Sequence, residues 1–370
     1  MTGLYDLFAR PALFALDAEN AHGLSIKALK AGVHPSADNG AFPRLRQTIA
    51  GLDFPNPLGM AAGYDKDAEV PGALLAMGFG FTEVGTVTPL PQPGNPRPRI
   101  FRMLRDDGVI NRLGFNSKGH DEAHRRLLAR KTRNTPPKRV GPVGVNLGAN
   151  KTSDDFAADY VQGIERFFDV ADYFTVNISS PNTPGLRALQ GQDPLESLLS
   201  RVSAARLEKQ AAGFARVPVF LKVAPDLDDD EMATIAEVLL ASDFDGLIVS
   251  NTTLSREGLK SANRDEAGGL SGAPLFERST IVLARMRKLL GKDNVLIGVG
   301  GISSGENAWT KLEAGANLLQ LYTGMIFKGP TLPSDIVRYL GKRMEKEGLT
   351  SVAELTGSAT GEWAGRALPQ

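Results

Sequence analysis

A polar loop follows a buried apolar segment near the middle of the chain, at residues 177–187. The segment 173–176 (YFTV) is aromatic and β-branched, which is typical of a buried strand. The loop itself reads NISSPNTPGLR, and its prolines exclude a long helix or strand. Its asparagines, serines and threonine could offer amide and hydroxyl groups to a planar, polar ligand. A surface turn can have the same composition, so the interpretation depends on the other strand ends.

The remainder of the chain alternates between short apolar segments and helical patterns. The predicted strands are 57–61, 81–85, 143–147, 173–177, 218–223, 246–250, 295–299 and 318–322. The predicted helices are 118–131, 155–169, 194–213, 229–241, 276–290, 305–314 and 333–347. This alternation predicts a (β/α)8 TIM barrel, in which active sites lie at the carboxyl ends of the strands. A doubly wound sheet is the competing fold, but the chain lacks the GxGxxG turn expected after its first strand.

The ends of the predicted strands carry polar side chains. In chain order these are Asp65, Lys66, Thr86, Asn146, Asn177, Lys222, Ser250, Asn251 and Thr252. Glycines follow the seventh and eighth strands at Gly300, Gly301 and Gly324, where barrels often bind phosphate through backbone N–H groups. Each glycine could equally serve a tight turn. Together the strand ends favour a polar ligand that carries a phosphate group.

Two of these residues are lysines. Lys222 lies between apolar neighbours in a predicted buried strand, where an ammonium group is costly unless it meets an anion. It could pair with an acid, stabilise negative charge on a reduced flavin, or form a Schiff base as in aldolases. The surrounding asparagines favour the flavin interpretation. Lys66 is either a surface lysine or a contact for an anionic substrate group.

Composition excludes several classes of function. The 370 residues contain 42 basic and 42 acidic residues, and this zero net charge disfavours a nucleic-acid-binding protein. The absence of cysteine excludes disulfides and thiolate metal sites, and the four histidines lack the spacing of a zinc site, so we expect no metal. No apolar run reaches the roughly 18 residues of a membrane-spanning helix. Acidic residues near the N-terminus also argue against a secretory signal.

The pattern of residues 1–34 predicts two short helices that form a unit separate from the barrel. Pro11 lies within the first apolar stretch and is expected to end or kink that helix. Asp17 is the predicted N-cap of the second helix. The apolar residues with helical spacing in the first helix are Leu4, Leu7 and Phe8. The pair could dock on its own core or lie in a membrane interface.

Four other segments complete the predicted organisation. Residues 35–45 form a polar linker, and 48–54 a small hairpin ahead of the barrel at 46–348. The connection 86–116 is long for a barrel loop, which favours a lid or a substrate-binding loop. Residues 349–370 are small and polar, and predict a loose C-terminal tail.

The motifs of the chain jointly resemble those of the quinone-dependent, class 2 dihydroorotate dehydrogenases from about residue 5 to about residue 345. They include AAGYDKD, EVGTVTP, NPRPRIFR, INRLGFNS, NISSPNTPGLR, SNTT, GVGGI and QLYTGMIFKGP. The resemblance implies FMN at the mouth of the barrel, oxidation of (S)-dihydroorotate to orotate, and electron transfer to ubiquinone or menaquinone. Class 1 enzymes place cysteine where this chain has Ser180, and they lack the N-terminal helices.

The resemblance also implies roles for individual residues. Ser180 takes the position of the catalytic base, and Thr183 is the nearest candidate for passing the proton on. The implied FMN-binding residues are Ala62, Gly63, Tyr64, Asp65, Lys66, Thr86, Asn146, Asn177, Lys222, Ser250, Gly272, Gly301, Tyr322 and Thr323. The implied substrate-binding residues are Lys66, Asn111, Arg112, Leu113, Gly114, Phe115, Asn177, Asn182, Asn251 and Thr252. The implied quinone tunnel contains His22, Arg102 and Tyr322.

The implied protein is a monomer bound peripherally to the cytoplasmic face of the inner membrane, where it serves pyrimidine biosynthesis. Three alternatives stay open at this point. One is a flavin barrel that passes electrons to fumarate or NAD, and another is a lyase that uses Lys222 as a Schiff base. The third is a non-catalytic membrane-binding scaffold. A flavin-dependent RNA reductase is disfavoured by the zero net charge.

Overall fold

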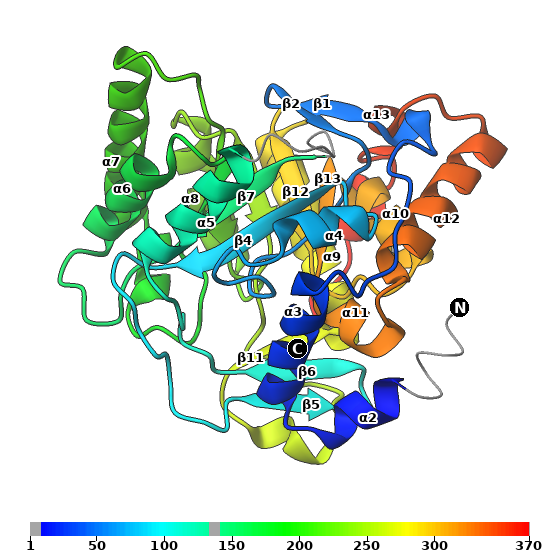
Figure 1. The fold of residues 1–370 in the computed structure, drawn as a ribbon. Helices are drawn as coiled ribbons and strands as arrows, with labels where there is room; N and C mark the ends of the chain where they lie inside the picture. Colours follow the sequence, from blue (N-terminus) through cyan, green and yellow to red (C-terminus); the bar gives the residue numbers. More distant parts are fainter. Residues whose placement is uncertain (1–8, 133–140, 370) are drawn as a thin grey trace.

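The computed structural model of the chain describes residues 9–132 and 141–369 (Figure 1). Leu4, Leu7 and Phe8 of the first predicted helix lie outside the described residues. Parallel strands close into a barrel in the order β10–β12–β13–β3–β4–β7–β8–β9, which confirms the predicted TIM barrel. The barrel strands are β3 (Leu58–Met60), β4 (Phe81–Val87), β7 (Val143–Leu147), β8 (Tyr173–Asn177), β9 (Val219–Val223), β10 (Gly246–Val249), β12 (Val295–Val299) and β13 (Leu318–Leu321).

Aromatic side chains fill the barrel at the amino ends of its strands. Phe81, Tyr173 and Phe220 begin or nearly begin their strands, and all three are buried. Phe54 of the preceding hairpin packs edge-on against Phe81, with 5.2 Å between the ring centroids. These rings fill the amino end of the barrel, so a ligand site is expected at the opposite, carboxyl end.

Every helix that the sequence pattern predicts in the barrel is present. Acidic side chains cap two of them, because Asp155 accepts the Ala158 N–H and Asp228 accepts the Glu231 N–H. The predicted helices are α5 (His120–Thr132), α6 (Phe156–Phe167), α7 (Gln192–Ala211), α8 (Asp229–Leu240), α9 (Phe276–Leu290), α10 (Gly305–Ala314) and α12 (Leu332–Glu347). The short helices α4 (Pro71–Ala76) and α11 (Thr323–Lys328) were not predicted, since one or two turns carry too little periodicity.

The N-terminal segment forms helices α2 (Arg10–Ala15) and α3 (Ala18–Lys30). Pro11 lies in the first turn of α2, where its missing N–H is tolerated, and the prediction that it ends or kinks a preceding apolar helix concerns residues outside the described ones. The Asp17 cap is confirmed, and its carboxylate accepts the N–H groups of Glu19 and Asn20, both at 3.0 Å. Within residues 9–132 and 141–369, no helix has both the length and the hydrophobicity to cross a bilayer.

Two small antiparallel sheets lie outside the barrel. The predicted hairpin is present as β1 (Gln47–Ile49) and β2 (Leu52–Phe54). The long connection 86–116 contains β5 (Ile100–Met103) and β6 (Gly108–Asn111), which pair with β11 (Gly269–Gly272). This second sheet lies beside α2 and α3, on the side of the barrel opposite the hairpin (Figure 1). The connection therefore contributes two strands to this sheet, and its role as a lid or a substrate-binding loop stays a prediction.

The prediction of a loose C-terminal tail was wrong. Residues 349–370 contain helices α13 (Val352–Leu355) and α14 (Thr360–Ala364), which pack on the outside of the barrel. The ring of Trp363 meets Phe276 of α9 edge-on, with 6.3 Å between centroids. The Gly357 N–H also donates to the Leu312 carbonyl of α10 at 2.9 Å. A few buried apolar residues hold this segment against the barrel. The mostly small and polar composition of the segment gives no sign of them.

Candidate active site

A cavity of about 640 Å³ lies at the carboxyl ends of the barrel strands. Strand-end residues such as Ser180, Lys222 and Ser250 line one part of it, and Phe14 of α2 and His22 of α3 line another. The volume is within the range that binds cofactor-sized ligands. The barrel and the N-terminal helices therefore share one cavity.

Most of the predicted site residues line this cavity. They are His22, Ala62, Gly63, Tyr64, Lys66, Thr86, Arg102, Asn111, Leu113, Gly114, Phe115, Asn177, Ser180, Asn182, Lys222, Ser250, Asn251, Thr252, Gly272, Gly301, Tyr322 and Thr323. Three other predicted residues, Asp65, Asn146 and Arg112, do not line it. The tertiary structure thus gathers residues from both ends of the chain into one site, and it places three of them behind its walls.

Asn177 is at the centre of a hydrogen-bond network below the cavity. Its Nδ2 donates to Thr86 Oγ1 and to Asn146 Oδ1, both at 3.1 Å. Its Oδ1 accepts the Ser179 hydroxyl at 2.6 Å, and Ser179 Oγ in turn accepts Asn251 Nδ2 at 2.9 Å. These bonds determine which polar atoms of Asn177 and Asn251 remain available to a ligand.

The buried carboxylate of Glu83 anchors this network from inside the barrel. Its Oε1 accepts Asn146 Nδ2 at 2.7 Å, so Asn146 must turn its own oxygen toward Thr86 and Asn177. The other oxygen, Oε2, accepts three further donors, from Tyr173 OH, Thr175 Oγ1 and Gln320 Nε2. Sequence reasoning did not identify Glu83, although an acidic residue inside an apolar strand was a usable signal.

Ser180 lies in an irregular loop, residues 178–186, that is named here the Ser180 loop. The side chain is 5% exposed and lines the cavity. Its Oγ accepts the Asn182 N–H at 3.2 Å, and Asn182 Nδ2 donates to the Asn111 carbonyl at 3.2 Å. Across the described part of the chain, no hydrogen bond joins the Ser180 and Thr183 side chains. The predicted proton relay through Thr183 therefore has no direct contact in this arrangement.

Both predicted lysines line the cavity. Burial lowers the pKa of Lys222, and the Glu83 carboxylate opposes this shift. Desolvation also lowers the pKa of Lys66, to about 8, against the opposing charges of Glu19 and Asp67. An anionic ligand would stabilise the charged form of both lysines, because an opposite charge favours the ammonium group.

Glycines and hydroxyl groups form another part of the cavity wall. Gly272 and Gly301 have φ values of +95° and +76°, which favour glycine. A Cβ at Gly301 would lie 2.3 Å from Phe276 Cα, so a side chain cannot fit there. The hydroxyls of Ser271 and Thr323 are 2.8 Å apart beside these glycines. Bare backbone N–H groups and hydroxyls suit a phosphate, so this wall fits the phosphate end of FMN and Lys222 fits its ring system.

Aromatic and polar side chains join the barrel to α3. Tyr322 OH is 3.3 Å from His22 Nδ1, and Tyr64 OH donates to Ser25 Oγ at 3.0 Å. Desolvation and the nearby Lys66 charge lower the pKa of His22 to about 3, so the ring is neutral at physiological pH. Arg102 of β5 donates to the Leu16 carbonyl at 2.8 Å and thereby holds the end of α2. Most of the α2 and α3 residues that line the cavity are apolar, among them Ala12, Leu13, Phe14 and Leu24.

The predicted residues Asp65 and Arg112 have other contacts. Asp65 accepts the N–H groups of Glu69 and Val70, and burial raises its pKa to about 6. The Arg112 guanidinium pairs with Glu266 at 2.7 Å and lies 4.5 Å from the centroid of the Phe101 ring. Both side chains shape loops that line the cavity, without lining it themselves.

A closed parallel barrel with a cavity at its carboxyl face, partly lined by polar strand-end side chains, defines the class of TIM-barrel enzymes. Comparison with known proteins gives the particular family, because the family model described as Dihydroorotate dehydrogenase matches residues 44–344. The chain belongs to the quinone-dependent dihydroorotate dehydrogenase family.

Relatives named "Dihydroorotate dehydrogenase (quinone)" match the chain at high identity. The relative from Brucella anthropi is 60% identical over 370 residues, which is 100% of both chains. The relative from Allorhizobium ampelinum is 58% identical over 357 residues, 96% of this chain and 97% of its own. The crystal structure of DHODH from Eimeria tenella in complex with ferulenol has 39% identity and a TM-score of 0.87, covering 92% of this chain and 95% of that chain.

Proposed function

We propose that the protein oxidises (S)-dihydroorotate to orotate with FMN as its cofactor, and that a membrane quinone receives the electrons. The observation that carries this proposal is the single cavity, which combines strand-end amides, two lysines and Ser180 with an apolar extension along α2 and α3. The family and its quinone-named relatives support the same conclusion. Such an enzyme would supply orotate for pyrimidine nucleotide biosynthesis.

The substrate would bind between the Ser180 loop and the wall that Asn111 and Phe115 form. The Lys66 ammonium suits the carboxylate of dihydroorotate as a point charge. The amides of Asn182 and Asn251, with Thr252, can hydrogen-bond to the groups of the ring. Leu113, Gly114 and Phe115 would cover the substrate and exclude water, which strengthens each of these bonds.

Ser180 is the proposed base that removes the C5 proton. A free serine hydroxyl is a poor base at neutral pH, so the proton must pass on at once to a further acceptor. The Asn182 N–H donates to Ser180 Oγ at 3.2 Å and keeps one side of the hydroxyl oxygen occupied. Holding the hydroxyl in place is the contribution of the loop, because proximity and orientation lower the barrier.

FMN, when bound, supplies the acceptor for the hydride that leaves C6. The residues proposed to hold it are Ala62, Gly63, Tyr64, Asp65, Lys66, Thr86, Asn146, Asn177, Lys222, Ser250, Gly272, Gly301, Tyr322 and Thr323. Asp65 and Asn146 would act from behind the wall by holding neighbouring groups. The Lys222 ammonium favours a negative ring system, because the pair of charges would be buried together.

The quinone would enter between α2 and α3 and stop near His22, Arg102 and Tyr322. Leu16, Leu24 and Val33 of this helical pair are exposed, which supports contact with a membrane surface. We propose a monomer attached peripherally to the cytoplasmic face of the inner membrane. The units proposed are the helical region 1–34, the barrel 46–348 and the C-terminal segment 349–370.

An anaerobic titration of the purified protein with dihydroorotate tests this proposal. The flavin absorbance should bleach on addition of substrate and return on addition of a quinone. A colourless protein that borohydride traps with an aldehyde substrate would instead support a Schiff base at Lys222. Reoxidation by fumarate or NAD in preference to quinone would contradict the proposed acceptor.

A further inference from the structure

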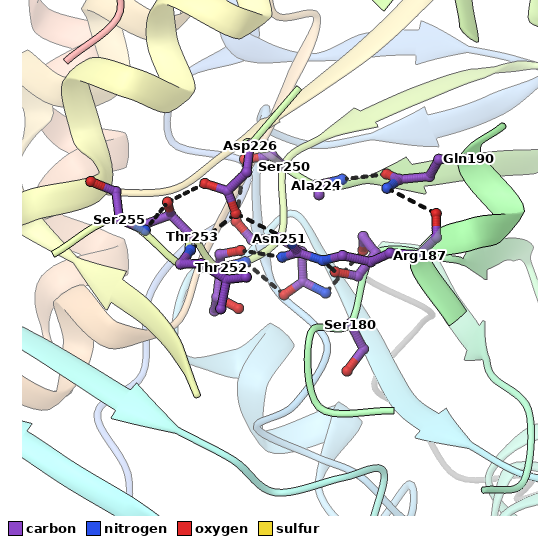
Figure 2. Close-up of polar contacts among 12 residues, drawn as sticks. Ser180, Arg187, Gln190, Ala224, Asp226, Ser250, Asn251, Thr252, Thr253 and Ser255 are labelled. Carbon is purple, nitrogen blue, oxygen red and sulfur yellow. Dashed lines mark hydrogen bonds and ion pairs between the residues drawn. The ribbon is translucent and has the colours of Figure 1, made fainter. Parts of the chain in front are cut away.

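The Arg187 side chain joins three loops that follow neighbouring strands of the barrel (Figure 2). Arg187 belongs to the short helix η3 (Leu186–Gln190). Its Nε donates to the Ser179 carbonyl at 3.1 Å, in the loop after β8. Its Nη1 donates to Asp226 Oδ2 at 3.1 Å, after β9, and its Nη2 donates to the Thr252 carbonyl at 3.2 Å, after β10.

Asp226 extends this junction to the remainder of the third loop. Its Oδ1 accepts the Thr253 hydroxyl and its Oδ2 accepts the Leu254 N–H at 3.0 Å. Thr253 also pairs with Leu270 of β11 through two backbone hydrogen bonds. The junction therefore connects the Ser180 loop, the 251–255 loop and the small sheet that covers the cavity.

Arg187 and Asp226 do not line the cavity, but Arg187 holds Thr252, which lines it, and Ser179, which is next to a residue that does. Ser179 precedes Ser180, and Thr252 follows Asn251. We propose that Arg187 and Asp226 are a positioning pair that sets the separation between the Ser180 loop and the 251–255 loop. The inference rests on the proposed function, since these two loops carry the proposed base and three proposed substrate contacts, Asn182, Asn251 and Thr252.

The chemistry of arginine explains why this residue suits the junction. Its planar guanidinium directs several N–H donors along fixed directions, so each of the three partners has one defined position. Lysine offers a point charge on a flexible stem and cannot reproduce that geometry. The Ser180 loop has neither helix nor strand to hold it, and the side chain of Arg187 is only 23% exposed. Its hydrogen bonds are therefore partly protected from water.

The test uses the holoenzyme with the variants Arg187→Met, Arg187→Lys and Asp226→Asn. Arg201→Met is the matched control, because it also removes an Arg–Asp pair, with Asp155 at 2.8 and 2.9 Å, from a surface away from the cavity. Orotate affinity is measured from the change in flavin absorbance, and FMN affinity from flavin fluorescence. Hydrogen–deuterium exchange of residues 178–187 and 251–255 reports on the junction without any ligand.

Arg187→Met should weaken orotate binding and slow flavin reduction by dihydroorotate, each by about tenfold. FMN affinity and the urea midpoint should stay close to those of Arg201→Met. Amide exchange should rise in both loops, including the 251–255 loop, which is distant from Arg187 in sequence. Arg187→Lys should recover little. Arg187→Met combined with Asp226→Asn should cost less than the sum of the two single variants, because both remove the same Arg187–Asp226 pair.

Orotate affinity within twofold of wild type in Arg187→Met would overturn the proposal. A parallel loss of FMN affinity and of stability would overturn it as well, because the pair would then serve the barrel in general. If the wild-type protein binds neither FMN nor orotate, the proposed function fails. Amide hydrogen exchange of the two loops in the variants would then show by itself whether the junction of Arg187 and Asp226 exists.

Discussion

The two walls of the cavity are built in different ways. The strand-end wall around Asn177 and Lys222 stands on fully buried strands and on hydrogen bonds that begin at Glu83. The helical wall is made by α2 and α3. Helix α2 has no buried residue, and α3 has three, namely Ala21, Ile26 and Leu29. One wall is part of the barrel core, whereas the other rests on its surface.

Two ion pairs join α3 to other parts of the structure. Arg99 pairs with Glu19 at 2.7 Å, and Lys30 pairs with Glu69 at 2.7 Å. Partly exposed pairs such as Lys30–Glu69 each contribute about 1 kcal/mol or less. This difference indicates that the barrel can form its polar site without the helices. It also indicates that the two walls can be altered separately, which the following predictions use.

The largest effect should come from Ser180 on the strand-end wall. Ser180→Ala should slow flavin reduction by dihydroorotate at least ~10²-fold, because a positioned base is lost. Stopped-flow absorbance measures this rate. Reoxidation of the chemically reduced variant by quinone should be unchanged, and Ser180→Cys should keep part of the activity. A reduction rate close to wild type would remove Ser180 from the mechanism.

Deletion of residues 1–34 removes the helical wall and should affect the reaction with quinone. Turnover with a long-chain quinone should fall at least ~10-fold, since loss of only about 1.4 kcal/mol of apolar contact has that effect. Dihydroorotate should still bleach the flavin, and a small water-soluble acceptor should still reoxidise it. Full turnover with the long-chain quinone would refute the assignment of the helical wall to quinone.

The pH dependence of ligand binding should also differ between the two walls of the cavity. Lys66 has a pKa of about 8, so the orotate dissociation constant should rise above pH 8 as the ammonium is lost, by up to tenfold per pH unit. In Lys66→Met this rise should disappear.

Because the pKa of His22 is about 3, the KM for quinone should show no transition near pH 6.5. Steady-state kinetics at fixed ionic strength measure both, and a quinone transition near 6.5 would mean that His22 titrates normally.

The last effect concerns stability in acid rather than catalysis. The pKa of His22 is about 3 in the folded protein, below its ordinary value of 6.5, so the unfolded state binds more protons between these values. The stability that His22 contributes is complete above pH 6.5 and is lost as the pH falls toward 3, at no more than about 1.4 kcal/mol per pH unit. His22→Gln should therefore show a weaker decline of its urea midpoint between pH 7 and pH 4. An equal decline in both proteins would contradict this assignment.

Local patterns in the sequence predicted the barrel and the polar strand ends that line its cavity. Thr86, Asn177, Lys222 and Ser250 follow or end apolar strands, and parallel strands bring their carboxyl ends to one face. The same reasoning placed Pro11 inside the first apolar stretch, and the structure shows it in the first turn of α2, where a proline is tolerated. It failed for residues 349–370, because burial of Trp363 depends on a partner helix distant in sequence.

The sequence by itself determined the order of strands and helices and the polar character of the strand ends, because both arise from patterns of a few neighbouring residues. Only the tertiary structure decided which polar side chains face the cavity and which stand behind it. Asp65, Asn146 and Arg112 turn to other partners, while Glu83 and Arg187 hold the residues that line the site. Those orientations depend on hydrogen bonds between segments far apart in the chain, and no local pattern encodes such bonds.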